Sequence, residues 1–400
     1  MTSTASLNNS PLKLKILFVY EDERAEYLID ELKEHVDLIG ILHLEWKKEL
    51  FFWVNLLLCA LKIVQIMIKK HAWTRVSFGV LYHNAIRRLS YIKKMSSKIE
   101  KHIKAMKVRP DLVLQWSSMF APYLNAPSVP FALIIDNYAD PPNSSIKKDK
   151  LRWWSSLHEG STLYDNSFYR LQKGLYSSSA CVFTFTKWCE RGLAKEYNID
   201  PAKIVSVGWG PAAKIEGRLF EKKPKTILAV GHDYLSKGFD ILVRSAEYLT
   251  DFSITIVGKD SGRSFNGLNI PENVNIMNYV SYKTLIRLYS ESELFFLFTE
   301  FEPAGHVLWE AQAYGCVIIG YDAYGISEAV IHNKTGILLK TRDPVLIAEQ
   351  IRKLYQDEIA LARMRNSAFQ NYIENGTWKV VSEKIKNRLE LVYGQKNKNC

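Results

Sequence analysis

The chain has 400 residues, of which 47% are hydrophobic and 24% charged, which excludes a chain disordered throughout. This length exceeds what one hydrophobic core usually covers, so two domains are expected. The formal net charge of +11, from 53 basic and 42 acidic residues, favours anionic partners.

The chain start and the cysteines indicate the compartment. Residues 1–13 lack the charged and apolar segments of a signal peptide. The five cysteines are scattered and show no C-x-x-C spacing, which disfavours both a disulfide framework and a zinc site. The sequence therefore predicts a cytoplasmic protein.

The first half of the chain predicts an α/β domain. Strand-like runs, separated mostly by helical stretches, are LKILFVY, DLIGILHL, PDLVLQW, PFALIID and ACVFTF. This alternation is typical of a doubly wound parallel sheet, whose ligands bind beyond the carboxyl ends of the strands. Asp136 follows PFALIID and is therefore a candidate site residue, although a helix cap or turn residue is the alternative interpretation.

Residues 51–68 are apolar except for Asn55, Lys62 and Gln65. A transmembrane helix is the least favoured interpretation because a lysine near its middle would be costly. A buried or interdomain helix and a membrane-surface helix are the other two.

A basic stretch follows this apolar segment. Its members are Lys93, Lys94, Lys98, Lys101, His102, Lys104, Lys107 and Arg109. A solvated helix surface and a surface peripheral to the inner face of an anionic membrane both fit it. Nucleic-acid binding is disfavoured because no stacking aromatic residues are interleaved with the basic ones.

The alternating pattern restarts after residues 206–225, a stretch rich in glycine, proline and charge that is typical of a linker. The strand-like runs of the second half are KTILAV, SITIV, VNIM, LFFLF, CVIIG and GILL, with a helix expected from about residue 237 to 249. Beyond residue 343 the chain is expected to be helical, and Trp378 opens a last amphipathic helix through Val392. A second sheet facing the first would create a cleft.

Two carboxylates stand out in EFEPAGHVLWEAQAYGCVIIG, residues 300–320. Glu302 follows a strand, Pro303 and Gly305 favour a turn into a helix whose first amides attract anions, and Glu310 lies on that helix. Both acids could line one side of the cleft. The alternative is that Glu302 caps the helix and Glu310 is a surface acid.

Other strand ends add candidates. Gly231 follows KTILAV, and Lys237 and Gly238 come at a helix start, a geometry suited to a charge on a phosphate. Gly325 and Glu328 follow CVIIG. No Walker P-loop and no G-x-G-x-x-G after the first strand are present, so an ordinary nucleotidase or dehydrogenase is not supported.

The segment from Glu300 to Leu339 resembles the donor-binding segment of the family 4 retaining glycosyltransferases, whose E-x7-E motif is matched by Glu302 and Glu310. The resemblance implies an α/β GT-B architecture of two facing Rossmann-like parallel-sheet domains. Residues 1–208 would form the acceptor domain and residues 209–376 the donor domain. Residues 377–400 would form a helix that crosses back to the first domain.

The resemblance also implies roles for single residues. Glu310 would bind the donor ribose, Glu302 would face the transferred sugar, and Lys237 would neutralise the diphosphate in place of a metal. Backbone amides around Ala304, Gly305, His306 and Val307 would hold sugar hydroxyls and the distal phosphate, and Gly231, His232 and Gly325 would complete the donor site.

The resemblance thus predicts a metal-independent, cofactor-free transferase that moves a hexose from a nucleotide diphosphate sugar to a glycan, lipid or small-molecule acceptor. Three positions depart from the family pattern, and two of them, Asp136 and His232, favour an alternative, a non-catalytic nucleotide-sugar-binding subunit of a partner transferase. Residues 21–23 are acidic where many members have a glycine-rich loop, Asp136 stands where many have histidine, and His232 stands where a stronger base is usual.

Overall fold

The computed structural model describes residues 14–20, 23–44, 89–116, 129–137, 166–213, 215, 217–232, 234–258, 265, 267–299 and 301–394. The apolar stretch 51–68 and the acidic residues Glu21 and Asp22 lie outside the described residues. Among the described helices, none combines the length and hydrophobicity needed to cross a membrane.

The first half of the chain forms a six-stranded parallel sheet in the order β2-β1-β3-β4-β5-β6. Most of its strands are buried along their length, as expected where helices cover both faces of a parallel sheet. The strands are β1 (Lys15–Tyr20), β2 (Asp37–His43), β3 (Leu112–Trp116), β4 (Phe131–Ile135), β5 (Val182–Thr184) and β6 (Ile204–Ser206). The helices are α1 (Ala25–Leu32), α4 (Leu89–Ala105), α6 (Asn166–Ser178) and α7 (Lys187–Glu196), with a 3-10 turn at Pro201–Lys203.

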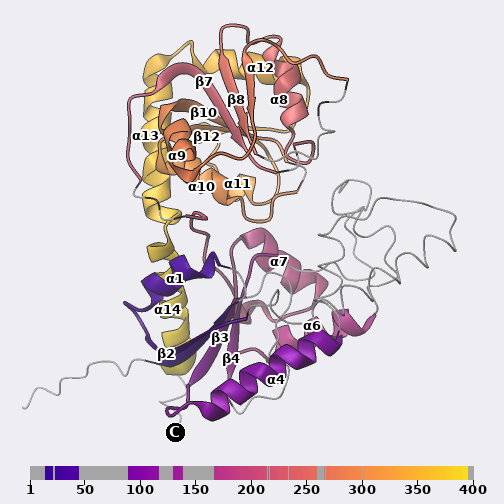
Figure 1. Ribbon diagram of the computed structural model, residues 1–400, viewed down its shortest axis with the longest axis vertical. Helices are drawn as coiled ribbons and strands as arrows, with labels where there is room; N and C mark the ends of the chain where they lie inside the picture. The colour runs from indigo at the N-terminus through magenta and orange to yellow at the C-terminus, as the bar shows by residue number, and fades with distance from the viewer. Residues whose placement is uncertain are drawn as a thin grey trace, which may run out of the picture.

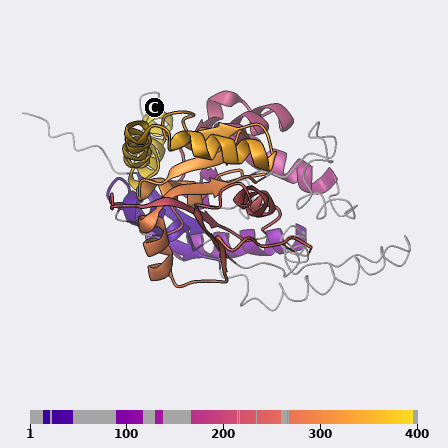
Figure 2. The same ribbon diagram turned by 90° about the horizontal axis from the view of Figure 1, so that it is seen from above.

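The second half forms another six-stranded parallel sheet, ordered β12-β11-β10-β7-β8-β9. Figure 2 shows helices on both sides of it. The strands are β7 (Lys223–Val230), β8 (Ser253–Val257), β9 (Val274–Met277), β10 (Ser292–Leu297), β11 (Val317–Tyr321) and β12 (Gly336–Leu339). The helices are α8 (Phe239–Ala246), α9 (Tyr282–Glu291), α10 (His306–Ala313), α11 (Ile326–Ala329), α12 (Pro344–Leu354) and α13 (Glu358–Asn375).

The prediction of two parallel α/β sheets is therefore confirmed, and so is the terminal helix, α14 (Trp378–Gly394). Figure 1 shows α13 running beside the second sheet and α14 continuing to the first, where it packs against α1. The division of the chain at residues 208 and 376 stays a prediction.

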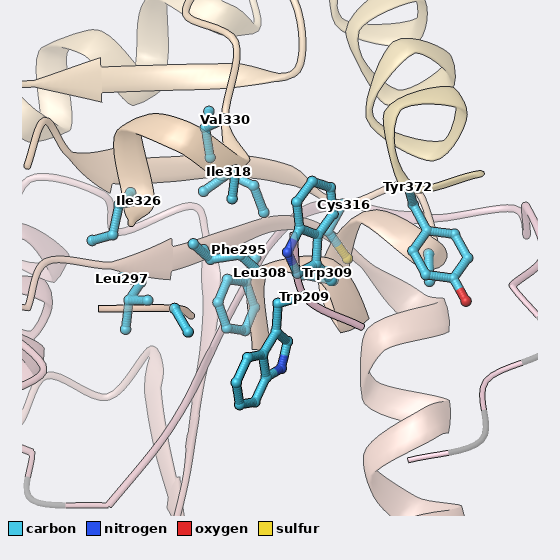
Figure 3. Close-up of a cluster of buried hydrophobic side chains, with 14 of the residues drawn as sticks. Trp209, Phe295, Leu297, Leu308, Trp309, Cys316, Ile318, Ile326, Val330 and Tyr372 are labelled. Carbon is cyan, nitrogen blue, oxygen red and sulfur yellow. The ribbon is translucent and has the colours of Figure 1, made fainter. Parts of the chain in front are cut away.

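The chain passes between the sheets through an aromatic cluster of Trp116, Phe185, Trp209 and Trp378. Ring centroids lie 3.8 Å apart for Phe185 and Trp209, and 5.8 Å apart for Trp209 with each of the other two tryptophans. Figure 3 shows Trp209 beside Leu308 and the buried side chains of the second sheet. The two domains thus share a continuous hydrophobic core at this crossing.

One additional strand and one helix boundary differ from the sequence predictions. The three-residue strand β6 was not expected, because its burial is incomplete and it is too short to show a pattern. Helix α8 begins at Phe239 rather than near Lys237, since Gly238 before it adopts a left-handed conformation that is not helical.

Candidate active site

The second sheet reverses its strand order between β7 and β10, so a crevice is expected where these two strands end. Lys237 comes from the loop after β7, and Glu302 from the loop after β10. The Lys237 Nζ atom lies 2.7 Å from Glu302 Oε2, with the two side chains only 24% and 12% exposed. The sheet topology therefore brings together two predicted site residues that are 65 positions apart.

The turn after β10 holds Glu302 through its own backbone. Glu302 Oε1 accepts a hydrogen bond from the Gly305 amide at 3.0 Å, and the Glu302 carbonyl accepts one from the Gly325 amide at 2.8 Å. Gly305 has φ of +72° and precedes α10, and an added Cβ there would lie 2.9 Å from Leu308. The left-handed conformation favours glycine at this turn, and a larger residue would also require the Leu308 side chain to shift.

The charge of Glu302 is set by two opposing effects. Burial by itself raises the pKa of this carboxyl, but the Lys237 ammonium, assisted by His306 and the Gly305 amide, outweighs burial and lowers the pKa below its ordinary value. Glu302 is therefore a carboxylate at neutral pH, largely buried beside a cation.

Helix α10 points its first turn at the same crevice. Its start at His306 leaves the first amides without acceptors inside the helix, and its dipole favours negative charge there. Ala304 and Gly305 are buried, whereas His306 and Val307 are partly exposed. The predicted backbone donors thus lie together around the end of the Glu302 turn.

Glu310 lies one turn further along α10 and is only 6% exposed. Its Oε1 accepts from the Ala212 amide at 3.2 Å, and its Oε2 accepts from the Tyr289 hydroxyl at 3.0 Å. Burial raises the pKa of Glu310 to about 7, although both hydrogen bonds act in the opposite direction. Glu310 is thus not a surface acid, and its predicted role in ribose binding stays a prediction.

The glycines predicted for the donor site lie where backbone passes close to these side chains. An added Cβ on Gly231 would lie 3.1 Å from Lys237 Cγ, and one on Gly325 would lie 2.8 Å from the Glu302 carbonyl oxygen. His232 follows Gly231 and is exposed. Their contact with a donor stays a prediction.

Asp136 is placed on the other sheet. It follows β4 at the carboxyl edge of the first sheet and is partly buried. Burial is the largest cause that raises the pKa of the Cys189 thiol on α7, and the charge of Asp136 raises it further. Its participation in catalysis stays a prediction.

A contact between the two domains near Glu302 was not predicted from the sequence. Arg24 Nη1 lies 3.3 Å from His306 Nε2, and its guanidinium lies 5.0 Å from the Trp209 ring centroid. The Trp209 and His306 rings are stacked with centroids 5.0 Å apart. Arg24 follows β1 in the first domain, so residues from both domains meet beside Glu302. In the sequence, only the position of Arg24 shortly after a strand could have indicated that it is a site residue.

Within the described part of the chain, no group of three or more histidine, cysteine, aspartate or glutamate side chains is arranged to hold a metal ion. The groups gathered at the crevice are instead a cation, a buried carboxylate and helix amides. Such a set can bind a phosphorylated ligand and stabilise charge that develops during transfer.

Solved structures with the same arrangement include a glycosyltransferase. A glycosyltransferase from Rickettsia africae superposes with a TM-score of 0.64 at 17% identity, covering 96% of this chain and 99% of its own. Anabaena HepE in complex with UDP-glucose gives 0.61 at 14% identity, covering 94% and 99%. The fold is therefore the GT-B architecture of two facing Rossmann-like domains.

The sequence comparison narrows the similarity to the second half of the chain. Residues 212–371, which include Lys237, Glu302 and Glu310, match the family of glycosyl transferases group 1. The D-inositol 3-phosphate glycosyltransferase of Corynebacterium diphtheriae is 27% identical over 185 residues, 42% of each chain. Such matches span about two fifths of the length of the curated relatives.

Proposed function

We propose that this chain is a retaining glycosyltransferase that moves a hexose from a nucleotide diphosphate sugar to a glycan, lipid or small-molecule acceptor. The observation that carries the proposal is the Lys237–Glu302 pair, 2.7 Å apart at the crevice, inside the segment that matches glycosyl transferases group 1. The similar fold of the Anabaena protein, which was crystallised with UDP-glucose, supports a nucleotide-sugar donor.

The pair suggests how the two charges act in turn. Negative charge grows on the departing diphosphate during transfer, and a fixed cation beside it lowers the barrier. Lys237 would leave Glu302 for the diphosphate when the donor binds, which frees the Glu302 carboxylate to stabilise positive charge on the sugar. In this proposal Lys237 takes the place of a divalent metal, and no cofactor is needed.

The remaining donor contacts follow from the helix. Amides from Ala304 to Val307 would hold sugar hydroxyls and the distal phosphate at the positive end of α10. Glu310 would accept hydrogen bonds from the ribose hydroxyls through the carboxylate lone pairs that the Ala212 amide and the Tyr289 hydroxyl leave available.

Nucleotide binding is the first test. UDP, GDP, ADP and their hexose conjugates are titrated by calorimetry and thermal shift, and a saturating ligand at 100 times its Kd should stabilise the fold by about 2.7 kcal/mol. Glu310→Ala should lose this effect, whereas Glu349→Gln, an exposed acid on α12, should keep it. Stabilisation by none of the nucleotides would contradict the proposal.

Transfer is the second test. Glu302→Ala and Lys237→Ala should lose most turnover, with Lys353→Met on α12 as the matched control for lysine. Proton NMR of the first product formed should give the same anomeric configuration as the donor. Full turnover in both crevice variants, or an inverted product, would refute the assigned chemistry.

A non-catalytic nucleotide-sugar-binding subunit is the second candidate. The observation that favours it is the enclosure of Glu310, whose two carboxylate oxygens are already engaged by the protein. Sugar transfer by the pure chain would exclude this candidate, whereas nucleotide binding without transfer would favour it.

We also propose that the protein is cytoplasmic and binds the inner face of an anionic membrane through α4. Lys93, Lys94, Lys98, Lys101 and Lys104 are all exposed on this helix, which Figure 1 shows along the outside of the first domain. Each lysine near such a surface contributes about 1 kcal/mol.

Vesicle flotation tests the membrane proposal. The protein should float with anionic and not with neutral vesicles, and Lys93→Gln/Lys94→Gln/Lys101→Gln should float less. Replacing three exposed lysines of the second domain, Lys283, Lys334 and Lys353, by glutamine makes the same change in net charge and should leave flotation intact. Equal flotation with both lipids would exclude an electrostatic surface.

A further inference from the structure

The first turn of α7 is completed by a side chain from the other domain. Helix α7 starts at the carboxyl edge of the first sheet, and its first amides have no acceptor inside the helix. The Thr186 hydroxyl accepts from the Cys189 amide at 3.3 Å. Glu328 on α11 of the second domain serves the other two amides, with Oε2 2.6 Å from the Lys187 nitrogen and Oε1 2.6 Å from that of Trp188.

The charge of Glu328 suits this position. A carboxylate at a helix N-terminus is favoured by the helix dipole and by charge-assisted hydrogen bonds to the amides. Arg191, one turn along α7, places Nη2 3.8 Å from Glu328 Oε1. The Glu328 side chain is 24% exposed but that of Arg191 is 71% exposed, so water screens this ion pair and the two amides are the main partners of Glu328.

Aromatic rings surround the same junction. The Trp188 ring lies edge-on to Phe301, with centroids 5.4 Å apart, and to Tyr324, with centroids 5.6 Å apart. Phe301 and Tyr324 also contact each other at 5.2 Å. A ring from the first domain therefore packs against two rings of the second.

These contacts end at the two segments that hold Glu302. Phe301 directly precedes Glu302, and Tyr324 directly precedes Gly325, whose amide donates to the Glu302 carbonyl. Movement of the start of α7, with Trp188, relative to the second domain would therefore displace the turn that carries Glu302.

We propose that Glu328 and Trp188 are positioning residues: they fix the Glu302 turn against the first domain, where the acceptor would bind. This inference rests on the proposed function, because Glu302 is taken to face the transferred sugar. The proposed nucleotide contacts lie mainly within the second domain, so loss of the junction should impair transfer rather than nucleotide binding. An interdomain contact that only stabilises the fold would leave the rate of transfer unchanged.

The test uses Glu328→Gln in the full chain, with Glu349→Gln as the matched control. Glutamine has nearly the same shape and one acceptor oxygen, so one of the two amides loses its partner. We expect kcat to fall about 10- to 100-fold through misplacement of Glu302, while the Kd for the nucleoside diphosphate changes by less than about twofold. Hydrogen exchange at the Lys187 and Trp188 amides should become faster.

A second pair of variants keeps the test decisive if Glu328→Gln does not fold. Trp188→Ala should lower kcat as strongly, and Trp188→Phe, which retains a ring for Phe301 and Tyr324, should restore most of it. Turnover unchanged in folded variants whose α7 amides exchange faster would overturn the positioning role. A parallel loss of nucleotide affinity would also overturn it, because the effect would then lie in the donor site.

The outcome is distinguishable from failure of the proposed function. A wild-type chain that binds no nucleotide and transfers no sugar refutes the function, and the positioning role with it. A wild-type chain that is active, with Glu328→Gln equally active, refutes the positioning role alone.

Discussion

Glu310→Gln should make the protein more stable at alkaline pH and leave its stability unchanged near pH 4.5. Glu310 is 6% exposed, and burial raises its pKa from an ordinary 4.5 to about 7. An ionised carboxyl in that position therefore costs about 3 kcal/mol, since each unit of pKa corresponds to about 1.4 kcal/mol. Glutamine removes this cost and retains the shape.

The two contacts of Glu310 can survive the substitution. The amide oxygen of glutamine can accept from the Ala212 amide as Oε1 does now, and its NH2 group can donate to the Tyr289 hydroxyl oxygen. The comparison thus isolates the charge, which most substitutions of a buried acid would not.

The sign of the pH dependence follows from the raised pKa. The folded state holds the Glu310 proton more tightly than the unfolded state, so the wild type is relatively most stable below pH 4.5. Its relative stability falls as pH rises from about 4.5 to about 7, and the cost is then constant. The advantage of the variant should therefore grow over this window.

Urea unfolding followed by circular dichroism at pH 4.5, 6 and 8 measures the difference. Glu349→Gln, which removes an exposed acid from α12, should give curves parallel to the wild type at every pH. An advantage of Glu310→Gln that is constant with pH, or that is largest at pH 4.5, would refute the reasoning. If the carboxylate also binds ribose, the more stable variant should bind nucleotide more weakly, a trade-off expected of a strained site.

Three further substitutions test the crevice. Lys237→Met removes the cation that lowers the pKa of Glu302 and that is proposed to bind the diphosphate. Calorimetry should therefore give a nucleoside-diphosphate affinity weaker by about tenfold or more, and an unchanged affinity would exclude Lys237 as a phosphate ligand. Gly258→Ala should destabilise the folded protein by about 3 kcal/mol, because Gly258 has φ of +146° and a Cβ there would lie 1.9 Å from the Gly231 carbonyl oxygen. Thermal unfolding measures this, and an unchanged melting temperature would count against the close approach. Gly325→Ala should slow transfer more than it weakens nucleotide binding, because its Cβ would lie 2.8 Å from the Glu302 carbonyl oxygen; equal losses would point to a general disruption.

The fold of the second domain was predictable in part because its strands β10 and β11 are buried on both faces. Runs such as LFFLF and CVIIG are apolar throughout, and the structure places them in β10 and β11 with almost every side chain buried. Parallel pairing of the strands then follows from the helices between them. Strand β6 has only three residues, two of them partly exposed, and such a short segment carries no period to detect.

Within the site, local patterns indicated residues but not their partners. Lys237 and Glu302 could be predicted because each follows a strand that ends at the same edge of the sheet. The engagement of Glu310 by Tyr289 and Ala212, by contrast, depends on how α9 and the interdomain segment pack on α10. No spacing along the chain encodes such packing.

The same limit applies to contacts between the domains. Arg24 and His306 are 282 positions apart, and Glu328 and Lys187 are 141 positions apart. Neither pair forms a motif. Their proximity results from the way two separately folded sheets face each other, which the sequence of either half does not specify.

The two sides of the domain junction differ in what it costs to separate them. At the chain crossing, the Trp378 Nε1 donates to the Pro211 carbonyl at 2.9 Å, and its ring packs against Gly210 and Trp209. Opening this side would expose large apolar rings to water, which is unfavourable. At the other side, the amides that Glu328 caps could exchange it for water at a small net cost, and the Trp188, Phe301 and Tyr324 rings that pack there are already partly exposed. Any opening between the domains should therefore pivot about the tryptophan cluster and break the Glu328 contact first, so closure would place Glu302 and form that contact in the same step.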